Sequence, residues 1–510
     1  MHFNKTFIGS FLMFVSAFFF VVANAHAEDA RLSAAIDRIF EDIENNAELY
    51  PHNAQLLDVQ LKERSIVLIF DSTLAQHINH ASAENMLHRL AALYPEFEGV
   101  EVIIDDGGRR NPIDSYLEQP ESVTAVKGTR NESIRGIDGE SVFPYDGALK
   151  GKRIAISPGH GWYWWEDNST WNTQRSLVNG IVEDFTNARL ADWHVVPALE
   201  HAGATVFNCR ERDFNTDEII VDDGSVAPLY TDDGGWWDGA YVVGYGNGKY
   251  RVNNATSPDQ NDKSAAWTPD FPADGTYAVY INFTSGSNRV TDARYTVIHA
   301  GGESTLLVDQ TVNGSRWLYI GSYAFAKGSN GQGVYLSTLS SEADGIKVVI
   351  ADAVKFGGGM GSTVRNGQPS GKPRWQEAAR YWVEFVGAPE STYNPSWAEN
   401  DADVTTRPLY ANWQGVDAYI SLHSNAFDGT ARGVGTWRYD GSNSSYPITD
   451  GSTELRNYIQ EEVLGAIRAE WDSGWVNYGL HTANFGELRV LEEAPGALLE
   501  LGFHDNAQDA

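Results

Sequence analysis

Hydrophobic and polar residues follow three different rhythms along the chain, and the first covers the N-terminal hundred residues. Apolar residues recur at helical spacing over 32–43 and again over 83–93. Between and after these stretches, 57–61, 66–70 and 100–104 alternate or run apolar as strands do. This pattern predicts a small α+β domain over 28–110, and the Gly, Pro, Ser and charged residues of 111–150 predict a linker.

The second rhythm is that of an α/β domain, and it occurs in two separate pieces. In the first piece, 151–216, the strand 153–156 is followed by a helical pattern over 175–202 and by the strand 205–208. In the second piece, 359–510, helical and strand patterns alternate over 375–385, 418–422, 452–470 and 497–501. Both pieces predict parts of one open, mostly parallel sheet.

The third rhythm separates those two pieces and contains no helical period. Short alternating runs punctuated by Gly, Asn and Asp fill 219–356. Residues 295–298 and 305–308 flank Ala300-Gly301-Gly302-Glu303, which is typical of a hairpin. We therefore expect an all-β sandwich over 217–358, inserted into a surface loop of the α/β domain, because loop-closure entropy penalises such insertions only weakly.

The first 27 residues have the composition of a secretory signal peptide. A short basic start with Lys5 precedes an apolar run over 7–22, and small residues stand at Ala23, Ala25 and Ala27. We expect cleavage after Ala25 or Ala27 and an exported protein, periplasmic or secreted. No later stretch approaches the roughly 20 continuous apolar residues of a membrane span, so none is expected after signal cleavage.

Charge and cysteine content narrow the chemistry. With 37 basic and 69 acidic residues the formal net charge is −32, and such a chain repels a phosphate backbone, so nucleic-acid binding is excluded. Cys209 is the single cysteine, which excludes Cys-based zinc clusters. A metal would have to be held by His, Asp or Glu.

Four residues of this kind are predicted to meet at one edge of the α/β sheet. His160, His423 and Glu500 lie at or near the ends of predicted strands, and Glu183 lies in the helical pattern that follows His160. The carboxyl ends of parallel strands line one crevice, where ligands bind. Two imidazoles and a carboxylate form the open ligand set of a catalytic zinc, and a further carboxylate supplies the base. The predicted reaction is hydrolysis of an amide.

The motifs around these residues resemble the zinc-dependent N-acetylmuramoyl-L-alanine amidases of bacterial cell-wall turnover. They occur in that family's order and are Ser157-Pro158-Gly159-His160-Gly161, Glu183, the run 407–412 leading to Ile420-Ser421-Leu422-His423-Ser424-Asn425-Ala426, and Ala494-Pro495-Gly496-Ala497-Leu498-Leu499-Glu500-Leu501-Gly502-Phe503. The resemblance implies that His160, Glu183 and His423 bind Zn²⁺ and that Glu500 is the general base. It also implies a peptidoglycan substrate, cleaved between the lactyl group of muramic acid and L-alanine.

The sequence departs from that family in two places. The segment between His160 and Glu183 is long, so Glu166 is a rival for the carboxylate ligand. The chain stops at Ala510, before the last helix that usually covers the sheet in the family, which leaves open whether it is a fragment.

The predicted insert resembles the β-sandwich modules found at the C-termini of golvesin and of some xanthan lyases. The residues that carry this resemblance include Ile220-Val221-Asp222-Asp223, Gly235-Trp236-Trp237, Ala266-Trp267-Thr268-Pro269 and Ala351-Asp352-Ala353-Val354. Contact with a polysaccharide through the insert is the expectation for such a module, and the protein is expected to be a monomer.

Other interpretations remain open at the level of sequence. The chain could be a catalytically silent wall- or polysaccharide-binding protein, or a zinc hydrolase of another exported substrate. Glu500 could instead form a buried salt bridge with Arg489 or Arg407. His77, His80 and His88, in the N-terminal domain, are predicted to be surface residues rather than metal ligands.

Overall fold

The computed structural model describes residues 30–46, 49–50, 54–62, 64–117, 134–136, 147–240, 242–358, 363–395 and 398–510. The chain divides into two compact units. Unit 1 draws on Met1–Pro120, Leu177–Ile181 and His423–Ala510, and unit 2 on Glu121–Ser176 and Val182–Leu422. The predicted signal peptide, 1–27, lies outside the described residues. Among the residues that are described, no helix has the length and apolar character needed to cross a bilayer.

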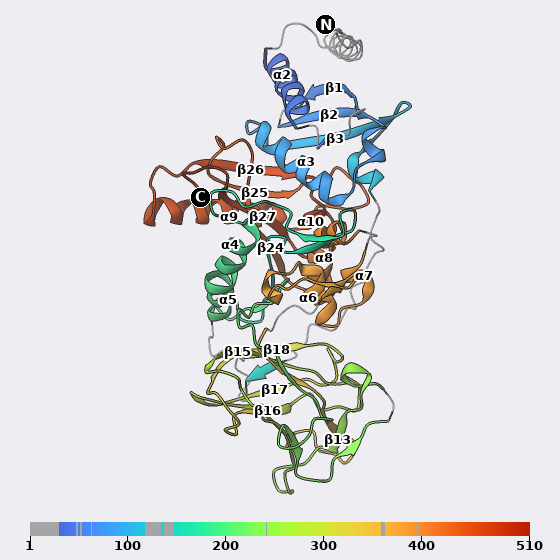
Figure 1. The fold of residues 1–510 in the computed structure, drawn as a ribbon, viewed down its shortest axis with the longest axis vertical. Helices are drawn as coiled ribbons and strands as arrows, with labels where there is room; N and C mark the ends of the chain where they lie inside the picture. The colour runs from blue at the N-terminus through green and yellow to red at the C-terminus, as the bar shows by residue number, and fades with distance from the viewer. Residues whose placement is uncertain are drawn as a thin grey trace. The chain divides into compact units, whose positions relative to one another are not determined.

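The N-terminal part of unit 1 has the predicted α+β composition (Figure 1). Helix α3 begins with a capping box, in which the side chains of Asn79 and Ser82 each accept a hydrogen bond from the other's backbone N–H. Strand β2 pairs antiparallel with β1 and parallel with β3. The elements are α2 (Ala30–Asn45), β1 (Leu56–Leu61), β2 (Ser65–Asp71), η1 (Leu74–Gln76), α3 (His80–Leu93), β3 (Gly99–Asp106), β4 (Arg109–Pro112) and η2 (Ile113–Tyr116).

These strands continue into the C-terminal strands of the same unit. β3 pairs parallel with β26, where Gly99 lies opposite Thr482. β25 then pairs parallel with β26 and antiparallel with β27, and α9 packs against β25 and β27. The elements are β25 (Val434–Tyr439), α9 (Ser452–Glu470), β26 (Asn477–Ala483), α10 (Gly486–Arg489) and β27 (Gly496–Phe503). The strand that carries Glu500 is therefore antiparallel to its neighbour β25.

Unit 2 holds a parallel α/β core. β6 (Arg153–Pro158) pairs parallel with β9 (Thr205–Asn208) on one side and with β24 (Ala418–Asn425) on the other. The division between the units falls inside β24, after Leu422. The remaining elements of this core are β7 (Tyr163–Trp165), β8 (Thr170–Asn172), α4 (Glu183–Leu190), a π-helical turn (Ala191–Val195), α5 (Val196–His201), β22 (Val364–Arg365), β23 (Gln368–Pro369), η5 (Arg374–Gln376), α6 (Ala379–Phe385), α7 (Glu390–Tyr393) and α8 (Glu399–Gln414).

One helix prediction in this core was wrong, and one helix was missed. The helix expected over 175–202 begins at Glu183, because Asn179 and Gly180 have positive φ angles (49° and 78°) and form a turn before it. The 16-residue helix α8 was not predicted, and it contains Pro408 in its interior.

The insert is an antiparallel β-sandwich, as predicted. Its core is rich in aromatic and β-branched residues, among them Trp267, Tyr277 and Val349. The expected hairpin is formed by β16 and β17, with His299 opposite Gly302. β5, from the segment predicted as a linker, pairs with β17. The elements are β5 (Ile134–Gly136), β10 (Ile219–Val221), β11 (Tyr230–Asp232), β12 (Trp237–Asp238), η4 (Tyr245–Asn247), β13 (Arg251–Asn254), β14 (Ser264–Trp267), β15 (Gly275–Ile281), β16 (Ala293–His299), β17 (Gly302–Val308), β18 (Leu318–Phe325), β19 (Gly333–Ser337), β20 (Val348–Ala351) and β21 (Val354–Phe356).

A buried ion pair ties the sandwich to the α/β core within unit 2. Lys355 Nζ, on β21, lies 3.2 Å from Glu211 Oε2, in the segment after β9, and both side chains are fully buried. Tyr280 Oη, on β15, donates to the other carboxylate oxygen at 2.6 Å. A buried pair of this kind leaves an uncompensated charge when one partner is removed.

Lys355→Met should therefore lower the free energy of unfolding by about 3–5 kcal/mol, because Glu211 would stay buried without its cation. The double variant Lys355→Met/Glu211→Leu should recover most of that loss. Thermal unfolding of the three proteins by scanning calorimetry measures this, with the exposed Lys327→Met as the control. Equal melting temperatures for Lys355→Met and the control would contradict the assigned role of the pair.

Candidate metal centre

The loop after β6 places His160 by backbone contacts. Gly159 N donates to Leu422 O, on the neighbouring strand β24, at 2.9 Å. Gly161 has φ 98°, and a Cβ at this position would lie 2.9 Å from the backbone of Glu377 and Ala378, so only glycine fits. The loop geometry that the sequence Ser157-Pro158-Gly159-His160-Gly161 encodes therefore holds His160 at the end of the strand, 2% exposed.

Glu183 and Asp184 open helix α4 and have separate tasks. Asp184 Oδ1 accepts a hydrogen bond from His160 N at 3.0 Å and thereby anchors the loop. Burial, followed by the neighbouring charge of Glu183, raises the pKa of Asp184, while Arg210 opposes this shift. Glu183 itself is 1% exposed, and its Oε2 lies 3.6 Å from Arg175 Nε.

His423 lies directly after Leu422 in β24 and is held by a second carboxylate. Its Nε2 is 3.2 Å from Glu487 Oε1, on α10. A carboxylate accepts, so the imidazole donates from Nε2 and keeps the lone pair on Nδ1. This is the arrangement by which an outer carboxylate fixes the tautomer of a metal-binding histidine.

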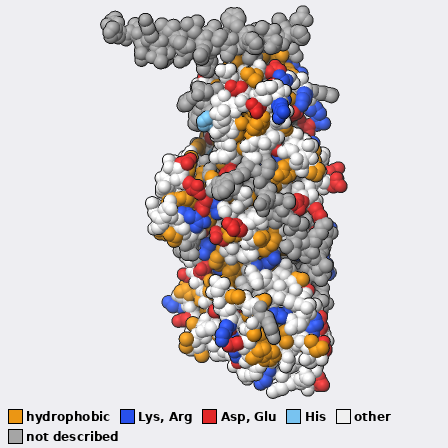
Figure 2. Space-filling model, turned by 90° about the vertical axis from the view of Figure 1, so that its right-hand side faces the viewer, with side chains coloured by type: hydrophobic (Ala, Val, Ile, Leu, Met, Phe, Trp, Pro, Cys, Tyr) orange, Lys and Arg blue, Asp and Glu red, His pale blue; other side chains and the backbone are white. Residues whose placement is uncertain are grey.

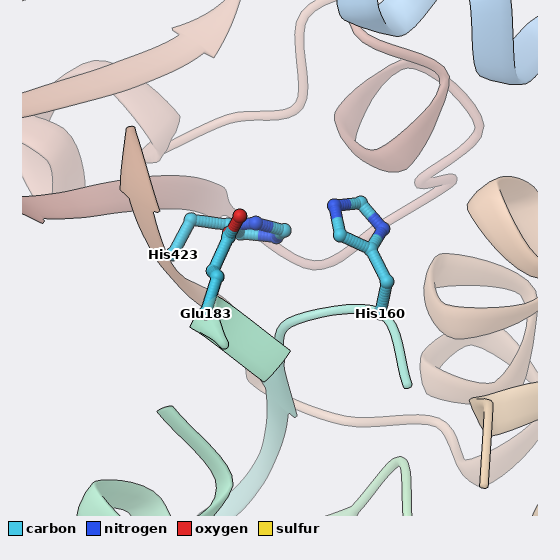
Figure 3. A group of neighbouring side chains, drawn as sticks. All are labelled: His160, Glu183 and His423. Atoms are coloured by element: carbon cyan, nitrogen blue, oxygen red, sulfur yellow. The ribbon is translucent and has the colours of Figure 1, made fainter. Parts of the chain in front are cut away.

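The three side chains converge on one point. One ligand atom each from His160, Glu183 and His423 lies within 4.8 Å of the other two, and all three residues are buried. Figure 3 shows the two imidazoles and the carboxylate turned toward one another. Two neutral imidazoles and a carboxylate in a buried place suit a divalent transition ion such as Zn²⁺ and leave a coordination position open.

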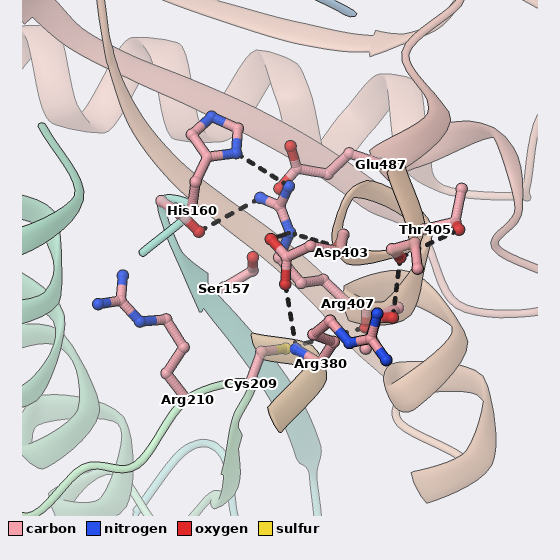
Figure 4. Close-up of polar contacts among 12 residues, drawn as sticks. Ser157, His160, Cys209, Arg210, Arg380, Asp403, Thr405, Arg407 and Glu487 are labelled. Carbon is pink, nitrogen blue, oxygen red and sulfur yellow. Dashed lines mark hydrogen bonds and ion pairs between the residues drawn. The ribbon is translucent and has the colours of Figure 1, made fainter. Parts of the chain in front are cut away.

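Arg407, on α8, contacts both the ring and the loop of His160. Its Nη2 lies 3.1 Å from His160 Nδ1, and its Nη1 donates to Gly159 O at 3.3 Å (Figure 4). Arg407 in turn is held by Asp403, to whose backbone oxygen its Nε donates at 3.1 Å. A ring nitrogen that accepts from a guanidinium carries no proton, so the proton of the neutral His160 imidazole is on Nε2 and would have to leave before that atom could bind a metal.

Glu500 has a partner that the sequence analysis did not predict. Its Oε1 lies 3.1 Å from Nδ1 of His88, on helix α3, and both side chains are 2% exposed. The His88 ring also stacks on Phe485 at 4.1 Å and lies 6.1 Å from the His423 ring. Arg489, one alternative partner for Glu500, instead lies 3.8 Å from Asp114.

The prediction that His77, His80 and His88 are surface residues was wrong for two of them. His77 is exposed, but His80 and His88 are 2% exposed, because α3 packs its polar residues against α10 and β27 of the same unit. Glu84, one turn before His88, accepts from Gly486 N at 3.1 Å. The spacing His80, Glu84, His88 is a stripe along one helix face and was the signal available in the sequence.

The rival ligand Glu166 is exposed in the turn after β7, outside the cluster. His481, buried and stacked on Trp437 at 4.7 Å, has a pKa lowered by burial to about 4 and is therefore a neutral packing residue.

Comparison with known proteins finds both predicted resemblances. Residues 392–510 match the family model "N-acetylmuramoyl-L-alanine amidase", and residues 219–358 match the "Golvesin C-terminal domain". A xanthan lyase of Bacillus sp. (strain GL1) is 34% identical over 139 residues, 27% of this chain and 14% of that protein. An uncharacterized cell wall amidase of Bacillus anthracis is 34% identical over 96 residues, 18% of this chain and 16% of that protein. The chain thus spans less than a fifth of the length of these relatives.

Among solved structures, Paenibacillus xanthan lyase aligns with a TM-score of 0.24 at 32% identity, over 28% of this chain and 13% of that one. An N-acetylmuramoyl-L-alanine amidase from Clostridium difficile 630 aligns with a TM-score of 0.18 at 28% identity, over 21% of this chain and 51% of that one.

The contact between His423 and Glu487 leads to a prediction about metal affinity. Glu487→Gln should weaken zinc binding about 10–100-fold, because the amide no longer fixes the charge and tautomer of the imidazole. Competition with a chromogenic chelator measures the affinity, and Glu461→Gln, an exposed substitution on α9, is the matched control. Equal zinc affinities in the two variants would show that Glu487 does not support the ligand.

Proposed function

We propose that the protein is an exported zinc-dependent amidase that hydrolyses the bond between N-acetylmuramic acid and L-alanine in peptidoglycan. The convergence of His160, Glu183 and His423 carries this proposal, because these are the ligand residues that the resemblance implies. The amidase match over residues 392–510, which includes His423 and Glu500, supports the same activity. The apolar segment at the N-terminus supports export.

In this proposal the chain divides the work among its own side chains. His160, Glu183 and His423 hold the ion, which when bound acidifies a coordinated water and polarises the substrate carbonyl. Glu500 accepts the proton of the attacking water and passes it to the leaving amine of the peptide stem. Such a proton shuttle contributes about 10²–10⁴-fold to the rate.

His88 is a positioning residue for Glu500. Its imidazole lies against the carboxylate at 3.1 Å, while stacking on Phe485 fixes the ring. A carboxylate held by a packed neighbour loses little orientational freedom when the substrate arrives. Helix α3 of the N-terminal part thus belongs to the surroundings of the proposed base.

The proposal predicts a separation of metal binding from rate. Glu500→Gln should retain one zinc per chain and lose about 10²–10⁴-fold in turnover, because the amide cannot take a proton. His423→Ala should lose both zinc and activity. Zinc is measured by atomic emission, and turnover by mass spectrometry of stem peptides and glycan strands released from purified sacculi.

Glu462→Gln, an exposed substitution on α9, serves as the control and should behave as the unmodified protein. Near-full turnover in Glu500→Gln would contradict the assignment of Glu500 as the general base. Release of a product other than a free stem peptide would show that the protein cleaves a different bond from the one proposed.

A further inference from the structure

A pocket apart from the proposed metal ligands lies in unit 2, where the sandwich meets the α/β core. Five basic residues line it: Lys150, Arg153, Arg210, Arg212 and Arg316. Its described lining contains no Asp or Glu. The chain as a whole carries almost twice as many acidic as basic residues, and Figure 2 shows carboxylates at many places on the visible face. The lining is therefore positively charged although the chain as a whole is negatively charged, and it favours an anion.

Three of these arginines already have protein partners. Arg212 Nη1 lies 2.8 Å from Glu200 Oε1. Arg210 donates to the backbone oxygens of Pro158 and Trp375, and Arg153 donates to that of Gln414 at 2.7 Å. These contacts hold the pocket wall in place and neutralise part of its charge.

Arg316 differs from them. Among the described residues it has no hydrogen-bond or ion-pair partner, and its Nε atom is buried. The face of its guanidinium stacks on Trp413, with Cζ 3.8 Å from the ring centroid. Burial lowers the pKa of Arg316 to about 10. The stacking fixes the plane of the group, and no partner is described for its two Nη nitrogens.

A half-buried guanidinium without a counter-charge is costly, and an arriving anion removes that cost. The planar N–H fork matches a carboxylate or a phosphate in bidentate fashion. The charge and the planar geometry of Arg316 therefore favour an oxyanion as the ligand.

The rest of the lining indicates what carries the oxyanion. Tyr319 is half-buried in the wall, with Arg212 Cζ 4.2 Å over its ring, and Asn313 and Gln414 are among the lining residues. Aromatic rings beside amide groups are suited to a sugar ring, which has an apolar face and a hydroxyl edge. The loop that carries Arg316 is tied to the core, because Trp317 N donates to Val386 O at 3.1 Å.

We infer that this pocket binds a pyranose that carries a carboxylate, with the carboxylate on Arg316 and the ring beside Tyr319. A uronic acid and the lactyl ether of muramic acid are two sources of that chemistry in glycans. The site is independent of the proposed amide hydrolysis, so loss of one would not imply loss of the other.

Titration of the full chain with two matched pairs of sugars tests the inference. Methyl β-D-glucuronide is compared with methyl β-D-glucoside, and N-acetylmuramic acid with N-acetylglucosamine, by ligand-observed NMR. At least one acid should bind saturably and about tenfold or more tightly than its neutral counterpart, because a hydrogen bond to a charged group is lost in the latter. The acid that binds identifies the source.

Arg316→Gln should weaken binding of that acid about tenfold or more, and Lys327→Gln, which removes an exposed charge from the sandwich, should leave it unchanged. Arg316→Lys keeps the charge and loses the fork, so it should also bind more weakly and serves if the first variant is unstable. Equal binding of acid and neutral sugars, tighter binding of inorganic phosphate than of either acid, or unchanged binding in both Arg316 variants would overturn the inference.

Discussion

The removal of charged and polar side chains from water is the constraint on which this structure depends. His160, Glu183 and His423 are each 2% exposed or less, and Asp184, Glu487 and Arg407, which contact them, are buried to a comparable degree. Such a set is costly unless every member has a partner. The contacts of Arg407 with His160, of Glu487 with His423 and of Asp184 with the His160 backbone provide those partners within the chain. Buried groups with fixed partners are also preorganised, which a metal centre requires.

The sequence was informative where a motif combined local geometry with unusual chemistry. Gly159 and Gly161 need positive φ angles, and Leu422 precedes a histidine at the end of an apolar strand, so the positions of His160 and His423 could be predicted from local signals. The α/β rhythm and the sandwich were likewise predicted, because periodicity reports which face of an element is buried. The roles of His160, Glu183, His423 and Glu500 remain predictions.

What the sequence did not reveal depends on contacts between distant segments. Nothing near His88 indicates that it lies against Glu500, more than 400 positions later, or that β3 pairs with β26. Glu487 lies in a four-residue helix without a recognisable pattern, and its importance follows only from the neighbouring imidazole. The helix start at Glu183 was missed because the turn at Asn179-Gly180 interrupts a stretch of otherwise acceptable helical spacing.

The contact between His88 and Glu500 has a consequence for how this protein can change over time. The helix that supplies the imidazole and the strand that supplies the carboxylate lie more than 400 positions apart in the sequence, yet a substitution in either alters the surroundings of the other. In natural variants, changes in one of these two segments should therefore be accompanied by changes in the other. The N-terminal part is, in this sense, inherited with the segment that carries Glu500 rather than as a detachable accessory.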